Sequence, residues 1–234
     1  MSEYPDKESK VKITPAGWSH AGFSFLTTLS VALVISYLTG PVTHNFRIIL
    51  YVLASTVPFS AFYFVISRKN ILPSQVSLFW FEIILYLLYV TSSALAVLLS
   101  SAEFMIASSA AGIILIVMTD MNYSPSGKRI YTYIHSGQNL LTALIIASFL
   151  SGLKAPFIFI AAIKLISNIY NAYSVESQNV YFSLRILRIA LLMAAGISLA
   201  TEISYSDPVV TFMFLTGEML DRIIYYYDME TKIG

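Results

Sequence analysis

The feature that most constrains this chain is a series of apolar runs, each about as long as a bilayer is thick. A helix needs about 20 residues to cross a hydrocarbon core of roughly 30 Å. Of the 234 residues, 57% are hydrophobic and only 12% are charged, whereas a soluble domain has about 25% charged residues. We therefore predict an all-α fold, a polytopic transmembrane bundle of about eight helices, over Gly17–Thr39, Phe46–Ile66, Val76–Ser100, Glu103–Thr119, Gly137–Leu153, Ala155–Ala172, Phe182–Thr201 and Pro208–Tyr226.

Polar tails flank this bundle, at residues 1–16 and 227–234. We interpret residues 1–16 as a tail rather than a cleavable signal, because no small-residue cleavage site closes a short apolar region. Lys and Arg favour the side that this tail occupies, at Lys7, Lys10, Lys12, Arg68, Lys69, Lys128, Arg129 and Lys232. Such a bias marks the cytoplasmic side, so both termini are expected to be cytoplasmic, provided that the number of helices is even.

Composition excludes several classes of site. The chain has no Cys, which rules out disulfides, thiolate metal sites and iron–sulfur clusters held by this chain. His20, His44 and His135 lie in three different segments without the spacing of metal ligands. The net charge of +1, without a basic patch, gives no reason to expect nucleic acid. With no P-loop, G-x-S-x-G or H-E-x-x-H motif, we expect no metal and no self-contained catalytic site.

The longest connection, Asp120–Ser136, combines turn formers with tyrosines and basic residues. Loops of this length in compact proteins are often binding elements. Tyrosine at the headgroup level is equally typical of ordinary membrane anchoring. As a docking element for a partner protein, the loop would use Tyr123, Lys128, Arg129, Tyr131 and His135.

The third run carries an ionisable residue, and a charge at the centre of a bilayer costs about 2.5–3.5 kcal/mol on insertion scales. Gln75, Glu82, Tyr86 and Tyr89 share one helical face by their spacing. Among the aromatic residues Phe79–Phe81, burial disfavours the charged form of the Glu82 carboxyl. That property suits proton uptake or release. A protonated Glu82 bonded to a tyrosine or to the backbone is the alternative.

The last three runs hold further polar residues. Lys164, Asn168 and Asn171 share a face of the sixth run, which predicts a polar seam between helices. The arginines of the seventh run need anionic partners or lie at the cytoplasmic headgroups. The eighth run holds the densest charge, either as a local i, i+4 salt bridge or as an interhelical cluster. The predicted structural charge cluster comprises Arg185, Arg188, Glu218, Asp221 and Arg222.

Five stretches of this chain resemble a known family. Gly217-Glu218, Arg222 and Tyr225-Tyr226 resemble the G-E-x-x-x-R-x-x-F-Y signature that closes the membrane anchor subunit of dimethyl-sulfoxide-reductase-type molybdoenzymes. The segments from Gly112 to Tyr123, at Ile130-Tyr131 and from Gln138 to Gly152 are similar to that family's fourth helix, loop and fifth helix. Ser67–Gln75 resembles its basic loop and third-helix start.

This resemblance implies a membrane subunit without a redox cofactor of its own, in the bacterial inner (cytoplasmic) membrane. It would tether an iron–sulfur electron-transfer subunit and a molybdopterin catalytic subunit, and would bind and oxidise quinol or menaquinol in anaerobic electron transport. Family members with quinol chemistry carry a His and a carboxylate where this chain has Arg68-Lys69 and Gln75. Glu82 would then take the proton, and Tyr86 or Gln75 would hold a quinone oxygen.

Two other functions remain open. A small transporter or channel would line a path with Lys164, Asn168, Asn171 and Glu218, although no internal repeat of the transporter type is visible. A structural protein that binds partners without a ligand is the third option.

Overall fold

The computed structural model describes residues 15–39, 46–70, 76–122, 138–174, 179–201 and 208–231. The described part folds into eight α-helices, which confirms the predicted all-α class. Their bounds lie within a few residues of most of the predicted runs: α1 Pro15–Thr39, α2 Phe46–Asn70, α3 Val76–Leu99, α4 Ala102–Asn122, α5 Asn139–Leu150, α6 Lys154–Ser174, α7 Asn179–Ala200 and α8 Pro208–Thr231.

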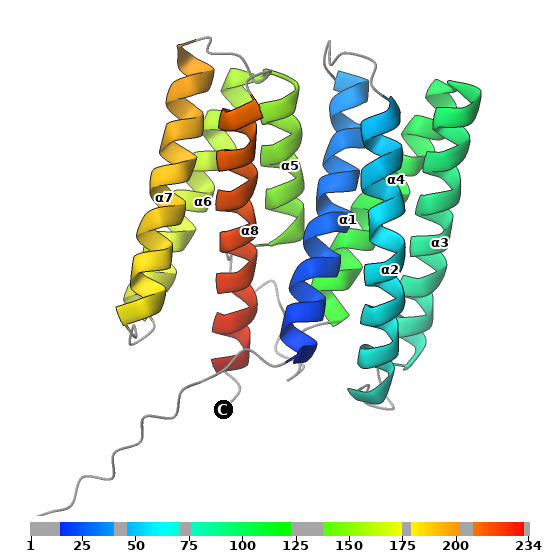
Figure 1. Ribbon diagram of the computed structural model, residues 1–234, viewed down its shortest axis with the longest axis horizontal. Helices are drawn as coiled ribbons and strands as arrows, with labels where there is room; N and C mark the ends of the chain where they lie inside the picture. The colour runs from blue at the N-terminus through cyan, green and yellow to red at the C-terminus, as the bar shows by residue number, and fades with distance from the viewer. Residues whose placement is uncertain are drawn as a thin grey trace, which may run out of the picture.

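The helices stand side by side in a bundle, and successive helices run in opposite directions (Figure 1). The beginning of α1 and the end of α8 consequently lie at the same end of the molecule (Figure 1). A short turn joins α5 to α6, where Gly152 adopts a φ of 67°. That left-handed conformation suits glycine because it has no Cβ.

α1 occupies a central place, since it contacts α2, α4, α5 and α8. Its buried face is rich in small side chains, including Ser24, Thr28, Ser30 and Ala32. Between membrane helices, packing depends on such small residues because lipid tails are as apolar as leucine. The small face of α1 therefore allows four neighbours to approach it.

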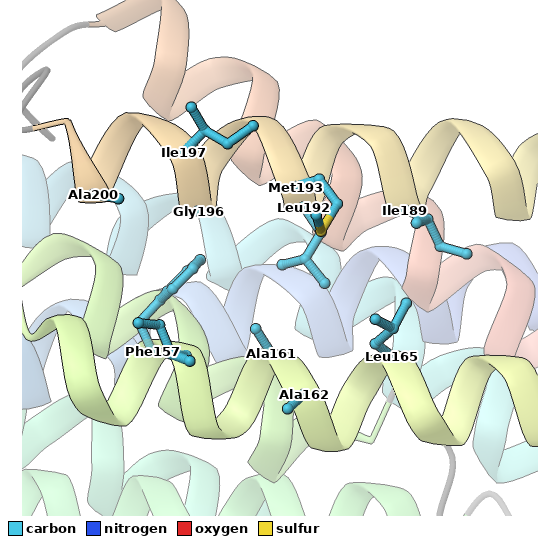
Figure 2. Close-up of a pocket in the computed structure, with 11 residues that line it drawn as sticks. Phe157, Ala161, Ala162, Leu165, Ile189, Leu192, Met193, Gly196, Ile197 and Ala200 are labelled. Atoms are coloured by element: carbon cyan, nitrogen blue, oxygen red, sulfur yellow. The ribbon is translucent and has the colours of Figure 1, made fainter.

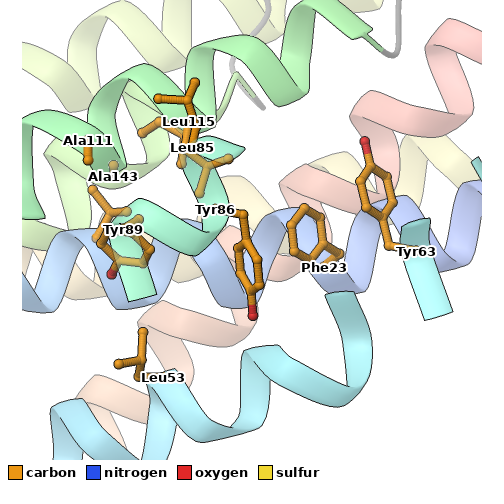
Figure 3. Close-up of a cluster of buried hydrophobic side chains, with 11 residues drawn as sticks. Phe23, Leu53, Tyr63, Leu85, Tyr86, Tyr89, Ala111, Leu115 and Ala143 are labelled. Carbon is orange, nitrogen blue, oxygen red and sulfur yellow. The ribbon is translucent and has the colours of Figure 1, made fainter. Parts of the chain in front are cut away.

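Two apolar clusters fill the bundle on either side of α1. One, among α1 to α5, includes Phe23, Tyr63, Tyr86 and Tyr89 (Figure 3). The Phe23 and Tyr63 rings stack there with centroids 4.3 Å apart. The other cluster, on α1 and α5 to α8, contains Ile145, Phe149, Phe157, Leu192 and Phe214 among others.

The structure describes a multi-pass membrane protein. Within the described ranges, five helices are long and apolar enough to cross a membrane: α1, α2, α3, α4 and α7. The other three of the eight runs predicted to span the membrane are shorter or more polar than these five helices. α5 has 12 residues, about 18 Å of helix, while α6 and α8 have 21 and 24 residues but carry buried charges. Exposed Tyr51, Leu98, Phe159 and Phe212 point to lipid contact around the bundle.

Candidate functional site

The interior of the bundle contains ionisable side chains from five helices. Among the described residues, four acidic and four basic side chains are buried: Glu82, Asp120, Glu218 and Asp221, and Lys164, Arg185, Arg188 and Arg222. Their formal charges cancel. This balance is what a low-dielectric interior requires, because a buried charge is tolerated when it is paired and hydrogen-bonded.

One group, which we call the midplane cluster, joins α6, α7 and α8 through Lys164, Arg188, Glu218 and Asp221. The Lys164 ammonium contacts the Glu218 carboxylate and lies 3.1 Å from Asp221 Oδ2. Arg188 Nη2 lies 2.9 Å from Asp221 Oδ2 and 4.0 Å from Glu218 Oε1. Lys164 also donates to Thr142 Oγ1 on α5, at 3.0 Å.

The midplane cluster lies near the middle of its helices. Lys164 is the eleventh of 21 residues in α6, Arg188 the tenth of 22 in α7 and Glu218 the eleventh of 24 in α8. All four members are at most 1% exposed. The sequence left open a local salt bridge or an interhelical cluster, and these contacts between helices favour the second. Arg185, one turn before Arg188, is also buried.

A second group connects the end of α4 with the start of α5. Asp120 Oδ2 accepts a hydrogen bond from the backbone N–H of Asn139 at 2.8 Å, and Oδ1 accepts one from Asn139 Nδ2 at 2.7 Å. Asn139 is the first residue of α5, whose N-cap residue Gln138 makes no side-chain capping bond. Asp120 therefore caps α5 from another helix, where a carboxylate also suits the helix dipole. Asn139 Oδ1 accepts from Thr28 Oγ1 on α1 at 2.8 Å.

Arg222 links this second group to α8. Its Nη1 lies 3.5 Å from Asp120 Oδ1, and its guanidinium lies 5.4 Å and 5.9 Å from the ring centroids of Tyr225 and Tyr226. The sequence reading placed Asp120 only at the start of a loop and missed this pairing. One sequence signal could have indicated this pairing: an acidic residue stands at the very end of one apolar run, and an arginine lies within another.

Glu82 forms the third group, on the α2–α3–α4 side. The Tyr63 hydroxyl donates to Glu82 at 3.1 Å and 3.2 Å from its two carboxylate oxygens, and Thr119 Oγ1 donates at 2.8 Å. Glu82 is fully buried. Tyr86 shares its face of α3 and is hydrogen-bonded to Thr56 at 2.8 Å. A Glu82 bonded to a tyrosine was one of the two alternatives that the sequence left open.

His20 adds a titratable ring that the sequence reading did not select. It lies edge-on against Tyr63 with ring centroids 4.6 Å apart, and its centroid is 6.1 Å from that of Tyr226. Tyr63 is bonded to Glu82 and Tyr226 lies beside Arg222. Because both rings lie near His20 of α1, the groups of Glu82 and Arg222 adjoin each other there. Nothing in the sequence spacing connects His20 to α2 or α8, since the contact depends on how the helices pack.

Gln75 and the docking residues Tyr123, Lys128, Arg129, Tyr131 and His135 lie outside the described residues. The same holds for the side chain of Asn171, whereas Asn168 is described and buried. Within the described ranges, no three His or carboxylate side chains gather as metal ligands.

No family model, curated protein or solved structure matches this chain. The three polar groups are therefore interpreted from their own geometry.

Proposed function

We propose that this chain is the membrane anchor subunit of a bacterial molybdopterin oxidoreductase complex. It would tether the iron–sulfur and catalytic subunits and would bind and oxidise quinol. The observation that supports this most is the contact between Arg222 and Asp120, 102 residues apart in the chain. Each belongs to one of the stretches that resemble the anchor family, so two separate parts of that resemblance meet at one buried ion pair.

Glycines in the same two stretches give further support. A Cβ at Gly217 would lie 3.0 Å from the Cβ of Leu191 on α7, and one at Gly112 would lie 2.7 Å from Val31 Cγ2 and 3.0 Å from the Tyr89 ring. The glycine before Glu218 thus allows the close approach of α8 to α7 that brings Glu218 towards Arg188. Both glycines let a helix that carries buried charge, α4 or α8, approach its neighbours closely.

Glu82 is our candidate for proton transfer. Oxidation of a quinol to a quinone releases two electrons and two protons. The electrons would pass to the iron–sulfur subunit, the Glu82 carboxylate would accept one proton, and the other proton would pass to solvent water. Tyr63 and Thr119 both donate hydrogen bonds to that carboxylate, and so fix its position for the proton transfer. Tyr86 would bind a quinone oxygen in place of Thr56, with Gln75 as the other candidate.

The substitution Glu82→Gln tests this role, because it keeps the shape of the side chain and removes its proton affinity. With a menaquinol analogue as donor, the iron–sulfur clusters of the purified complex should be reduced at least about 100-fold more slowly, the usual loss for a missing acid–base group. Dithionite, which bypasses the membrane subunit, should reduce the clusters as before. The rate is followed by their visible absorbance.

Glu103→Gln is the matched control, since Glu103 is an exposed acid in the first turn of α4. It should leave the rate unchanged. An unaltered rate in Glu82→Gln would remove Glu82 from the mechanism, although the anchoring role would stand.

A transporter is the second candidate, and the midplane cluster is the observation in its favour. Ionisable residues at mid-depth often mark ion or proton pathways. A transporter would act without redox partners, so the isolation of the native assembly separates the two functions.

A further inference from the structure

An apolar groove of about 310 Å³ runs between α6 and α7 (Figure 2). All the side chains that line it are apolar, and small residues, among them Ala161, Ala162 and Gly196, make room for it. The other lining residues are Phe157, Ile158, Leu165, Ile189, Leu192, Met193, Ile197 and Ala200. A Cβ at Gly196 would lie 3.6 Å from the Phe157 ring, an ordinary contact. Gly196 therefore leaves free space rather than avoiding a clash.

The depth of the groove matches one leaflet of a bilayer. It starts at Phe157 in the first turn of α6 and at Ala200, the last residue of α7, and reaches Leu165 and Ile189. At 1.5 Å per residue these stretches measure about 12 Å and 16 Å, against roughly 15 Å for half of the hydrocarbon core. Because Ser183–Ala200 of α7 is apolar enough to span a membrane, the groove opens to lipid.

A basic side chain, that of Lys154, lies at the outer end of the groove. Lys154 is exposed, is the first residue of α6, and precedes Phe157 and Ile158 by one turn. Residues spaced by three and four share one helical face, so Lys154 lies above the groove.

We propose that this groove binds one acyl chain of an anionic glycerophospholipid, with its phosphate at Lys154. The inner end of the groove lies beside the midplane cluster, because Leu165 follows Lys164 and Ile189 follows Arg188. The helices already bury these ion pairs, and a bound chain adds an apolar layer beside them that helps to keep the dielectric around them low. The head of a quinone is neutral, so it would gain a hydrogen bond from Lys154 but not the ion pair that a phosphate makes.

The test uses the full chain in nanodiscs of equal parts phosphatidylglycerol and phosphatidylcholine, with retained lipid counted by native mass spectrometry. The wild-type chain should retain one phosphatidylglycerol. Ala162→Leu and Gly196→Leu fill the groove and should retain at least about fivefold less. Lys154→Gln should keep a lipid but lose the preference for phosphatidylglycerol.

Ala190→Leu is the matched control, since Ala190 is exposed on α7 and does not line the groove; it should behave as wild type. Circular dichroism verifies the fold of each variant. If one of the two groove variants loses helix content, the lipid retention of the other variant tests the proposal. Equal retention by the folded groove variants and by Ala190→Leu would overturn the proposal. So would a wild-type chain without preference for phosphatidylglycerol, or one that retains a quinone there when isolated from native membranes. None of these three results bears on the anchor role.

Discussion

At the scale of single residues, Asp120 shows how one side chain can hold three helices together. It accepts hydrogen bonds from the first residue of α5 and pairs with Arg222 of α8. Removal of one partner from a buried ion pair typically costs about 3–5 kcal/mol, because the other charge stays buried and uncompensated. Asp120 and Arg222 should therefore be among the most sensitive positions of the chain.

We expect Asp120→Asn and Arg222→Met each to lower the free energy of unfolding in detergent by about 3–5 kcal/mol. The double variant should lose clearly less than the sum, because it leaves neither charge alone. Unfolding in a detergent mixture followed by circular dichroism measures all three. Losses that add up within about 0.5 kcal/mol would show that the two residues do not interact.

Sequence reasoning found some of these residues for a physical reason. A charge inside an apolar run must be paired, and this argument selected Glu82, Lys164, Arg188, Glu218 and Asp221, which the structure shows buried and bonded to other helices. It missed Asp120 and His20, since each lies near a helix end where water would satisfy it. Only the packing of distant helices reveals that they are buried.

At the scale of elements, hydropathy predicted where the helices lie but not how they differ. α5 is short because it begins at Asn139, which is buried and capped by Asp120. α8 is less apolar because it carries three buried charged residues close together, Glu218, Asp221 and Arg222. Which helix contacts which could not be predicted, since pairing inside lipid depends on small residues and polar contacts rather than on hydrophobicity.

The sequence predicts that all eight helices cross the membrane, and labelling of single cysteines tests this directly because the chain has no native cysteine. Single cysteines at Ser101, between α3 and α4, and at Leu153, between α5 and α6, should react with an impermeant maleimide on intact spheroplasts. Cysteines at Ser2 and Lys232 should react only after lysis, as the Lys and Arg bias implies. If Leu153→Cys reacts from the same side as Ser2→Cys, α5 and α6 do not cross as proposed.

At the scale of the whole molecule, the bundle pairs a lipid-facing exterior with a polar interior whose charges cancel. Helices α1, α4, α5 and α8 are tied by the bonds of Asp120 and Asn139, and α5 to α8 by the contacts of the midplane cluster. These contacts join six of the eight helices into one unit, so the bundle can serve as a membrane platform. That is the property the proposed anchor role requires.

Isolation of the native assembly tests this role most directly. The chain, tagged at its N-terminus, is purified in a mild detergent from the membranes of its own host grown without oxygen, beside an unrelated tagged multi-pass protein as control. The account predicts two further polypeptides in equal amounts, together with iron and molybdenum by elemental analysis. A chain that is isolated alone and without either metal, from cells that contain it at its native level, would contradict the account.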